Sequence, residues 1–208
     1  MDLAADENAI RTEGLRQSAR SSAPQSEVGG GRSSGGRDTP VAPGRDTGVP
    51  PGAGVGPGLL IRRHNLPHWQ IGGSVYFVTF RCSRGRLGAA CRHIVKEVLL
   101  YDHGRRYDLH IATVMPDHAH AVVRPRESSP GRWFDLAQIT KTIKGVSGRR
   151  INRLLGTRGR RVWRPESYDR IIRDEDEYNE KVNYVAENAF KDNLCRDPLE
   201  YEFLIIPG

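Results

Sequence analysis

The feature that most constrains the fold is the stretch Val114–Val123, in which a Pro-Asp pair separates two apolar runs. Pro116-Asp117 is a typical turn dipeptide, so the flanking runs are predicted to pair as a tight antiparallel hairpin. His118 and His120 stand two positions apart at the start of the second run. Because side chains alternate along a strand, both imidazoles face the same side, about 7 Å apart, and can converge on one metal ion.

The pattern around this hairpin predicts a mixed domain of strands and helices. Four strands are expected from β-branched and aromatic runs, at residues 74–82, 109–114, 118–124 and 168–172. Helices are expected at 89–103 and 133–155, with a polar loop at 126–132; Gly145 and Gly148 each cost about 1 kcal/mol and allow the second helix to bend or end. The order strand, helix, strand, strand, helix, strand predicts an α+β, ferredoxin-like split βαβ fold with a central antiparallel sheet.

A closing helix is predicted by its own start signal. Asp174 is the expected N-cap, and Glu177 follows three residues later, as in a capping box. Its buried stripe is expected to comprise Tyr178, Val182, Val185 and Ala189. Tyr184 and Asn188 are one turn apart and lie roughly 100° from that stripe, so we expect Tyr184 at the edge of the core beside a polar amide.

Composition divides the chain near residue 58. Residues 1–58 contain no Phe, Tyr or Trp but hold 12 of the 23 glycines, so we expect a disordered tail followed by one folded domain at 59–208. Six arginines against seven acids give this tail a net charge of −1. Because the whole chain has a net charge of +7, residues 59–208 carry +8. That excess favours a polyanionic partner.

Cysteine use and hydropathy indicate the redox compartment and bear on whether the chain spans a membrane. The three cysteines are scattered and form no CxxC pair, which argues against a disulfide framework and suits a reducing cytosol. No apolar run approaches the ~20 residues of a membrane span, and the N-terminus lacks a signal-peptide core.

Three blocks of the sequence, taken together and in order, resemble the HUH superfamily of single-tyrosine transposases from insertion sequences. The blocks are Met115-Pro116-Asp117-His118-Ala119-His120, Trp163 with Tyr168–Glu175, and Tyr184-Val185-Ala186-Glu187-Asn188. These motifs are most similar to those of the REP-associated tyrosine transposases, and the resemblance extends over roughly residues 62–195. Two positions depart from the usual pattern: Asp117 replaces Asn, and Ala189 replaces Pro.

The resemblance implies a DNA transposase or endonuclease that cleaves and rejoins single-stranded or hairpin DNA. Tyr184 would be the nucleophile that forms a 5′-phosphotyrosine, and His118 and His120 would hold a divalent ion, Mg²⁺ or Mn²⁺. Asn188 is the candidate third ligand. No small-molecule cofactor is needed, since the phosphotyrosine retains the bond energy. The family's members act as monomers or homodimers, and the implied location is the bacterial cytosol at the nucleoid.

Basic residues form the predicted nucleic-acid interface: Lys141, Lys144, Arg149, Arg153, Arg161 and Arg164. Their density in a domain of charge +8 favours phosphate contact, although a solvated helix face would have the same composition. Trp163 can either stack on a base or pack in the core.

Each candidate residue also has a plainer interpretation. Taken alone, His118 and His120 are more typical of partly exposed strand histidines, and Tyr184 is more typical of a helix-edge tyrosine. Asn188 is equally typical of a C-cap. Two other functions therefore remain open: a basic nucleic-acid-binding module without catalysis, and a zinc-stabilised interaction protein. The complete set of His118, His120 and Tyr184 favours the enzyme over the first, and the lack of further His or Cys at zinc spacing disfavours the second.

Overall fold

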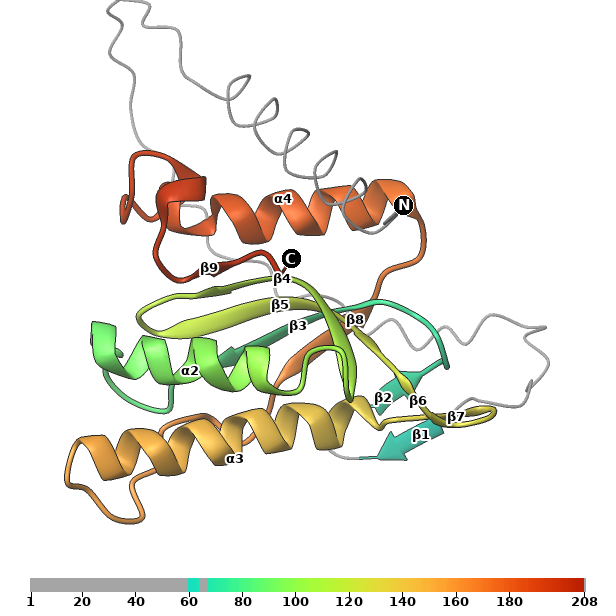
Figure 1. The fold of residues 1–208 in the computed structure, drawn as a ribbon, viewed down its shortest axis with the longest axis horizontal. Coiled ribbons are helices and arrows are strands. Elements are labelled where there is room, and N and C mark those ends of the chain that lie inside the picture. Colours follow the sequence, from blue (N-terminus) through green and yellow to red (C-terminus); the bar gives the residue numbers. More distant parts are fainter. Residues whose placement is uncertain (1–59, 64–66, 208) are drawn as a thin grey trace, which may run out of the picture.

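The structure is a computed structural model that describes residues 60–63 and 67–207 (Figure 1). The elements, in chain order, are β1 (Leu60–Arg63), β2 (Pro67–Gln70), β3 (Tyr76–Arg81), α2 (Ala89–Tyr101), β4 (Tyr107–Val114), β5 (His118–Pro125), β6 (Glu127–Ser129), β7 (Arg132–Trp133), α3 (Leu136–Leu154), β8 (Tyr168–Ile171), α4 (Glu175–Lys191), the 3-10 turn η1 (Pro198–Glu200) and β9 (Leu204–Ile205). The tail predicted at residues 1–58 lies outside the described residues.

A five-stranded antiparallel sheet in the order β8-β3-β5-β4-β9 forms the centre of the molecule. Its first four strands have the arrangement of a split βαβ unit, in which the first and third strands are neighbours at the middle. The predicted α+β, ferredoxin-like fold is therefore confirmed. The β4–β5 hairpin turns where predicted, with the backbone N–H of Met115 donating to the carbonyl oxygen of His118 at 2.8 Å.

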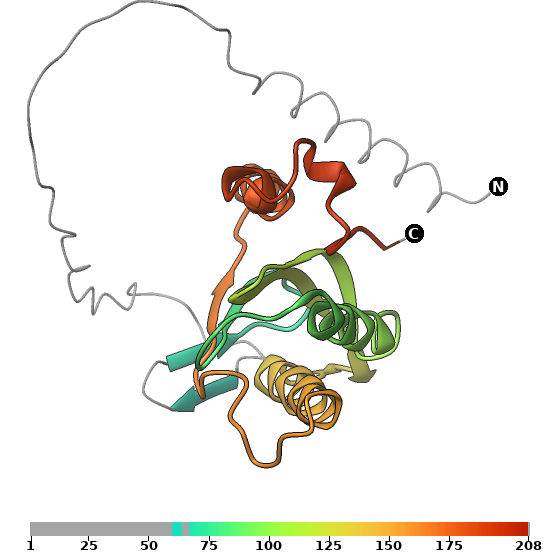
Figure 2. The same cartoon turned by 90° about the vertical axis from the view of Figure 1, so that its left-hand side faces the viewer.

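The helices cover opposite faces of this sheet. Figures 1 and 2 place α4 on one side and α2 with α3 on the other. Side-chain contacts agree, because alternate residues of β3 reach different helices. The Phe77 ring packs edge-on against Tyr184 of α4. The Phe80 ring instead packs against Trp163, whose indole Nε1 donates to Ser147 Oγ of α3.

Helix α3 is continuous, contrary to the expected bend or end at Gly145 and Gly148. Buried Ile143, Ser147 and Ile151 repeat at helical spacing through this segment. Packing of that stripe offsets the propensity cost of about 1 kcal/mol for each glycine.

Three local predictions differ from the structure. The predicted polar loop 126–132 forms much of the β6–β7 hairpin, and Trp133 belongs to β7 instead of beginning a helix. Asp135 begins α3, because its carboxylate accepts from the N–H of Ala137 at 2.9 Å. Strand β9, which extends the sheet beyond β4, was not predicted: Leu204-Ile205 is too short to give a periodic signal.

Helix α4 begins at the predicted residue with a modified capping box. The Asp174 carboxylate accepts from the N–H of Glu177 at 2.8 Å, which confirms the N-cap. The Glu177 carboxylate accepts from the N–H of Arg173, one residue before the cap, at 3.0 Å. Two donors at the helix start are thus satisfied, as in a capping box, but the second belongs to the preceding residue.

Cys82, Cys91 and Cys195 are all free thiols. Within residues 60–63 and 67–207, no helix has both the length and the apolar character needed to cross a membrane.

Candidate active site

His118 and His120 begin strand β5 on the face that α4 covers. Both are buried, with exposed fractions of 8% and 3%. Their ring centroids lie 4.5 Å apart. The hairpin therefore places the two imidazoles close together on one face of the sheet, as predicted.

The His120 ring is held in place by β3. Its Nδ1 lies 2.7 Å from Thr79 Oγ1, the residue directly across the β3–β5 ladder, and the ring stacks on Phe77 at 5.3 Å. Its Nε2 is buried and has no hydrogen-bond partner among the residues that the structure describes. Burial, together with the neighbouring His118 and Arg81, lowers the pKa of His120 to about 3, so its imidazole is neutral at neutral pH and can offer a lone pair.

His118 is anchored by the turn that precedes it. Its Nδ1 lies 2.8 Å from the Asp117 carboxylate, and its Nε2 lies 3.2 Å from Asn188 Oδ1 of α4. Burial alone would raise the pKa of the Asp117 carboxyl, but the hydrogen bond and charge of His118, with Arg81, hold that pKa below its ordinary value. The ionised Asp117 carboxylate can thus accept a hydrogen bond from the Nδ1–H of His118 and so orient the imidazole.

These contacts leave two acceptors facing one another. With its proton on Nδ1, a neutral His118 points the lone pair of Nε2 at the lone pairs of Asn188 Oδ1. A shared cation resolves that arrangement, as would a proton on Nε2 or a rotated amide. Both histidines are anchored at Nδ1, so a ligand would bind at their Nε2 atoms, of which that of His118 already lies beside Asn188 Oδ1.

Asn188 is not a C-cap. Helix α4 ends with Asp192 as its C-cap, four residues after Asn188, which is itself buried at 8% exposure. The plainer interpretation of this asparagine is wrong, because its side chain faces His118 across the interface between α4 and the sheet.

Tyr184 lies over the histidine pair from the same helix. Its ring centroid is 5.2 Å from that of His120 and 5.8 Å from that of Phe77, and its side chain is 40% exposed. The predicted edge position is confirmed. The ring is partly packed, while one side of the residue is open to solvent.

Three donors would be available to the predicted divalent ion. Two imidazole nitrogens and one amide oxygen would leave positions open for the oxygen ligands that Mg²⁺ or Mn²⁺ prefer. Among the residues that the structure describes, no group of three or more His, Cys, Asp and Glu could hold a metal ion. Asn188 would therefore have to complete the set, and a closed zinc site of the usual kind is not present in this part of the chain.

The chain shares its fold with a REP-associated tyrosine transposase. That structure, solved bound to a REP hairpin, aligns with a TM-score of 0.56 and 18% identity over 68% of this chain and 82% of the other. No family model matches the sequence. No curated protein matches it either.

The predicted basic residues do not gather around Tyr184. Lys141, Arg149 and Arg153 are exposed on α3, which lies on the opposite side of the sheet from α4 (Figure 2). Arg161 is exposed in the loop after α3. Only Arg164 lies close to the histidines: its N–H donates to the carbonyl oxygen of Arg81, which pairs with His118 across the sheet.

Lys144 differs from the other basic residues. Its ammonium donates to Pro165 O at 2.8 Å, Glu166 O at 3.2 Å and Ser167 Oγ at 2.9 Å. Burial lowers its pKa to about 8. The structure thus gives Lys144 the task of holding the loop before β8, and contact with phosphate stays a prediction.

Sequence reasoning missed the residues that orient the histidines. Thr79 and Phe77 lie on β3, and their pairing with β5 is not deducible from local patterns. Asp117 could have been found, because an acid directly before a strand histidine can reach its Nδ1. Trp163 is buried at the Phe80 ring, so core packing accounts for it and stacking on a base does not.

Proposed function

We propose that this protein is a metal-dependent single-tyrosine DNA transposase or endonuclease that cleaves and rejoins single-stranded DNA. The observation that carries the proposal is the position of Tyr184, with its ring 5.2 Å from that of His120 and its side chain partly open to solvent. The fold shared with a transposase bound to a DNA hairpin supports a hairpin substrate.

In this proposal Tyr184 Oη attacks the phosphorus of a backbone phosphate. A bond forms between the phenolic oxygen and phosphorus, and the bond from phosphorus to the 3′ oxygen breaks. The phenol loses its proton and the leaving 3′ oxygen takes one up, so a 5′-phosphotyrosine and a 3′-OH result. Attack by a 3′-OH reverses the step without a nucleotide cofactor.

His118, His120 and Asn188 would hold the divalent ion. When bound, Mg²⁺ or Mn²⁺ polarises a phosphate oxygen and stabilises the charge that develops on it. Asp117 and Thr79 act as positioning residues, because each occupies the Nδ1 of one histidine and leaves its Nε2 for the ligand. A phenol has a pKa of about 10 in water, so it is mostly protonated at neutral pH and is a poor nucleophile. The reaction therefore depends on holding the Tyr184 oxygen in line with the phosphorus.

The site is assembled within one chain. Tyr184 and Asn188 of α4 reach His118 and His120 of the same molecule. We therefore propose that a monomer suffices for cleavage.

A second candidate is a nucleic-acid-binding module without catalysis. The exposed basic residues of α3, on the far side of the sheet from α4, favour it, because they could bind phosphates without using Tyr184. A covalent adduct separates the two functions.

The test is incubation with a labelled single-stranded DNA hairpin and Mn²⁺, followed by a denaturing gel. The wild type is expected to give a covalent protein–DNA band, and Tyr184→Phe none. Tyr168→Phe is the matched control, since Tyr168 is also exposed and also packs edge-on against Phe77, at 6.4 Å. A wild type that binds the hairpin tightly without any adduct would favour the binding module.

A further inference from the structure

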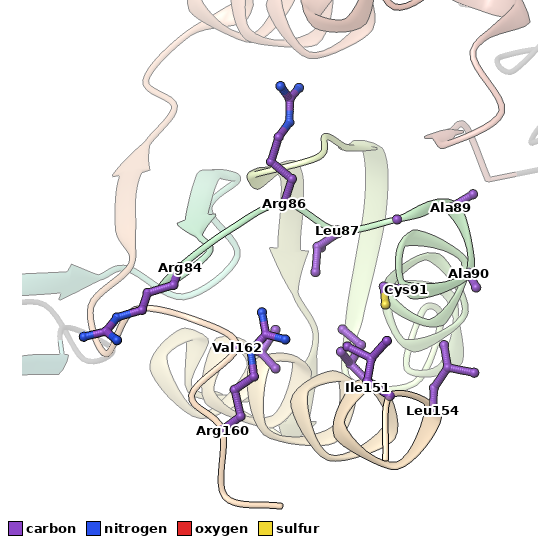
Figure 3. A pocket seen from close by; sticks show the side chains of 12 residues that line it. Arg84, Arg86, Leu87, Ala89, Ala90, Cys91, Ile151, Leu154, Arg160 and Val162 are labelled. Atoms are coloured by element: carbon purple, nitrogen blue, oxygen red, sulfur yellow. The ribbon is translucent and has the colours of Figure 1, made fainter. Parts of the chain in front are cut away.

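A groove of about 440 Å³ lies outside the candidate active site (Figure 3). It is formed by the loop 82–88, the first turn of α2, the last turn of α3 and the loop that follows α3. Its volume is within the range of sites that enclose small organic ligands, roughly 300–1,000 Å³.

The floor of the groove is apolar. Leu154 and Leu155 at the end of α3 line it and are 52% and 47% exposed. Buried Ile151 and Val162 continue the same surface. Two adjacent, uncovered leucines at a concave surface indicate a ligand with an apolar face.

The rim of the groove is cationic. Arg84, Arg86 and Arg160 line it, and within residues 60–63 and 67–207 none of them forms an ion pair. Among the described residues, no Asp or Glu lines the groove, and the first turn of α2 has no acidic residue. Figure 3 shows Arg160 beside the floor and Arg84 and Arg86 directed outward from it, so the groove favours an extended polyanion that carries a flat apolar part.

The loop 82–88 joins the groove to the candidate active site. The N–H of Cys82 donates to Asp117 O at 2.7 Å, and the N–H of Leu87 donates to Pro116 O at 2.5 Å. Arg84 and Arg86 therefore project from a segment that is hydrogen-bonded to the turn holding His118. Figure 3 shows Arg86 directed away from the groove floor, toward α4. Because α4 and the groove lie on opposite sides of the sheet, a strand that reaches both would have to pass over this loop.

We propose that the groove binds one unpaired nucleotide of the DNA strand that Tyr184 acts on. The base lies on Leu154 and Leu155, Arg160 contacts the phosphate beside it, and Arg84 and Arg86, which point away from the floor, contact phosphates farther along the strand. An unpaired nucleotide is required because paired bases are stacked and offer no face to an apolar floor. The inference rests on the proposed function and names a part of the substrate that the site itself does not contact.

Methyl NMR of the full chain tests the proposal directly, with a short oligothymidylate as the probe. The methyl signals of Leu154 and Leu155 are expected to shift on titration, while those of Leu100, exposed on α2, stay in place. An abasic oligonucleotide of the same length should leave the Leu154 and Leu155 signals nearly unmoved. Equal shifts with the abasic strand, or no shift with oligothymidylate at saturation, would overturn the assignment of the base to this floor.

Matched variants test the contributions of the rim and the floor. Arg84→Ala is expected to lower the slope of log K against log salt by about 0.7, the share of one phosphate contact on a single strand. Arg105→Ala removes the same charge at the other end of α2 and should leave the slope unchanged. Leu154→Ser is expected to weaken oligothymidylate binding about fivefold, against no change for Leu100→Ser. Arg84→Ala with an unchanged slope would contradict the rim contacts.

The adduct assay distinguishes failure of this inference from failure of the proposed function. If a Tyr184 adduct forms while the groove methyls stay in place, the groove assignment is wrong and the transposase proposal stands. If the methyls move and no adduct forms, the groove binds nucleic acid and the proposed chemistry is wrong.

Discussion

The two faces of strand β5 are both buried, but one carries apolar side chains and the other carries histidines. On the side of α2 and α3, Ala119 and Ala121 are buried among apolar side chains. On the side of α4, His118 and His120 are equally buried, and one of their nitrogens has no partner. A buried polar atom without a partner costs about 1–3 kcal/mol. The comparison teaches that one face supplies stability, while the other gives up some of it at the site that we propose to be catalytic.

The largest expected effect comes from removing one histidine on the α4 side. His118→Ala should lower hairpin cleavage about 10³-fold, because the metal's contribution of several kcal/mol to the charged transition state is lost. DNA affinity should change little, since docking relies on other contacts. Cleavage kinetics, with Mn²⁺ affinity from electron paramagnetic resonance, provide the measurement. Full activity in this variant would remove the metal role of His118.

The burial of His120 should make the stability of the metal-free protein sensitive to acid. Its pKa is about 3 in the folded protein against 6.5 for an unperturbed histidine, so between these values the unfolded chain binds the proton and the native state does not. Stability is complete above pH 6.5 and falls with pH, by up to about 2 kcal/mol between pH 7 and pH 5.

Urea denaturation in the presence of a chelator measures this loss. His120→Gln should flatten the profile between pH 7 and pH 5, because the titrating group is gone. Asp117 contributes in the same direction only near and below its ordinary pKa of 3.8, outside this window. An equally steep profile in His120→Gln would show that other groups govern the acid sensitivity.

Two phenylalanines on opposite faces of β3 sharpen the comparison further. Phe80→Leu and Phe77→Leu should each destabilise the fold by about 1–2 kcal/mol, since both rings are buried. Only Phe77→Leu should also reduce cleavage, about tenfold, because that ring contacts both His120 and Tyr184. Equal cleavage by the two variants would show that ring packing does not position the site.

The smallest effects are expected from the exposed charges of α3. Arg153 neighbours the groove leucine Leu154, whereas Lys141 is twelve residues earlier in the helix, about 18 Å away. Arg153→Ala should therefore lower the salt slope of DNA binding by about 0.7, and Lys141→Ala should lower it less. A larger change for Lys141 would place the DNA along the far half of α3.

Much of this arrangement could be predicted because its signals are local. The hairpin at Pro116-Asp117, the N-cap at Asp174 and the spacing of Tyr184 and Asn188 on one helix all depend on neighbouring residues. These signals, together with the order of the predicted elements, were sufficient for the α+β fold class and for the position of Tyr184 at the edge of the core.

The remainder depends on contacts between distant segments. Thr79 reaches His120 only because β3 pairs with β5, and the 2.7 Å contact joins residues 41 positions apart. Lys144 looked like a phosphate ligand because its sequence neighbours are basic, yet a loop more than twenty residues later takes up its ammonium. The start of α3 was missed for a different reason, which is local. The apolar pattern placed it at Trp133, whereas the Asp135 side chain caps the helix two residues later.

Peptide mapping of the trapped protein–DNA adduct tests most directly whether the α4 face is the reactive one. The wild-type chain would be incubated with a single-stranded DNA hairpin and Mn²⁺, digested, and analysed by mass spectrometry. We predict a 5′-phosphate linked to Tyr184 alone. Tyr178 on the same helix and Tyr168 on β8 serve as internal controls and should carry none. DNA attached to any other tyrosine, or an adduct that persists in Tyr184→Phe, would contradict the account.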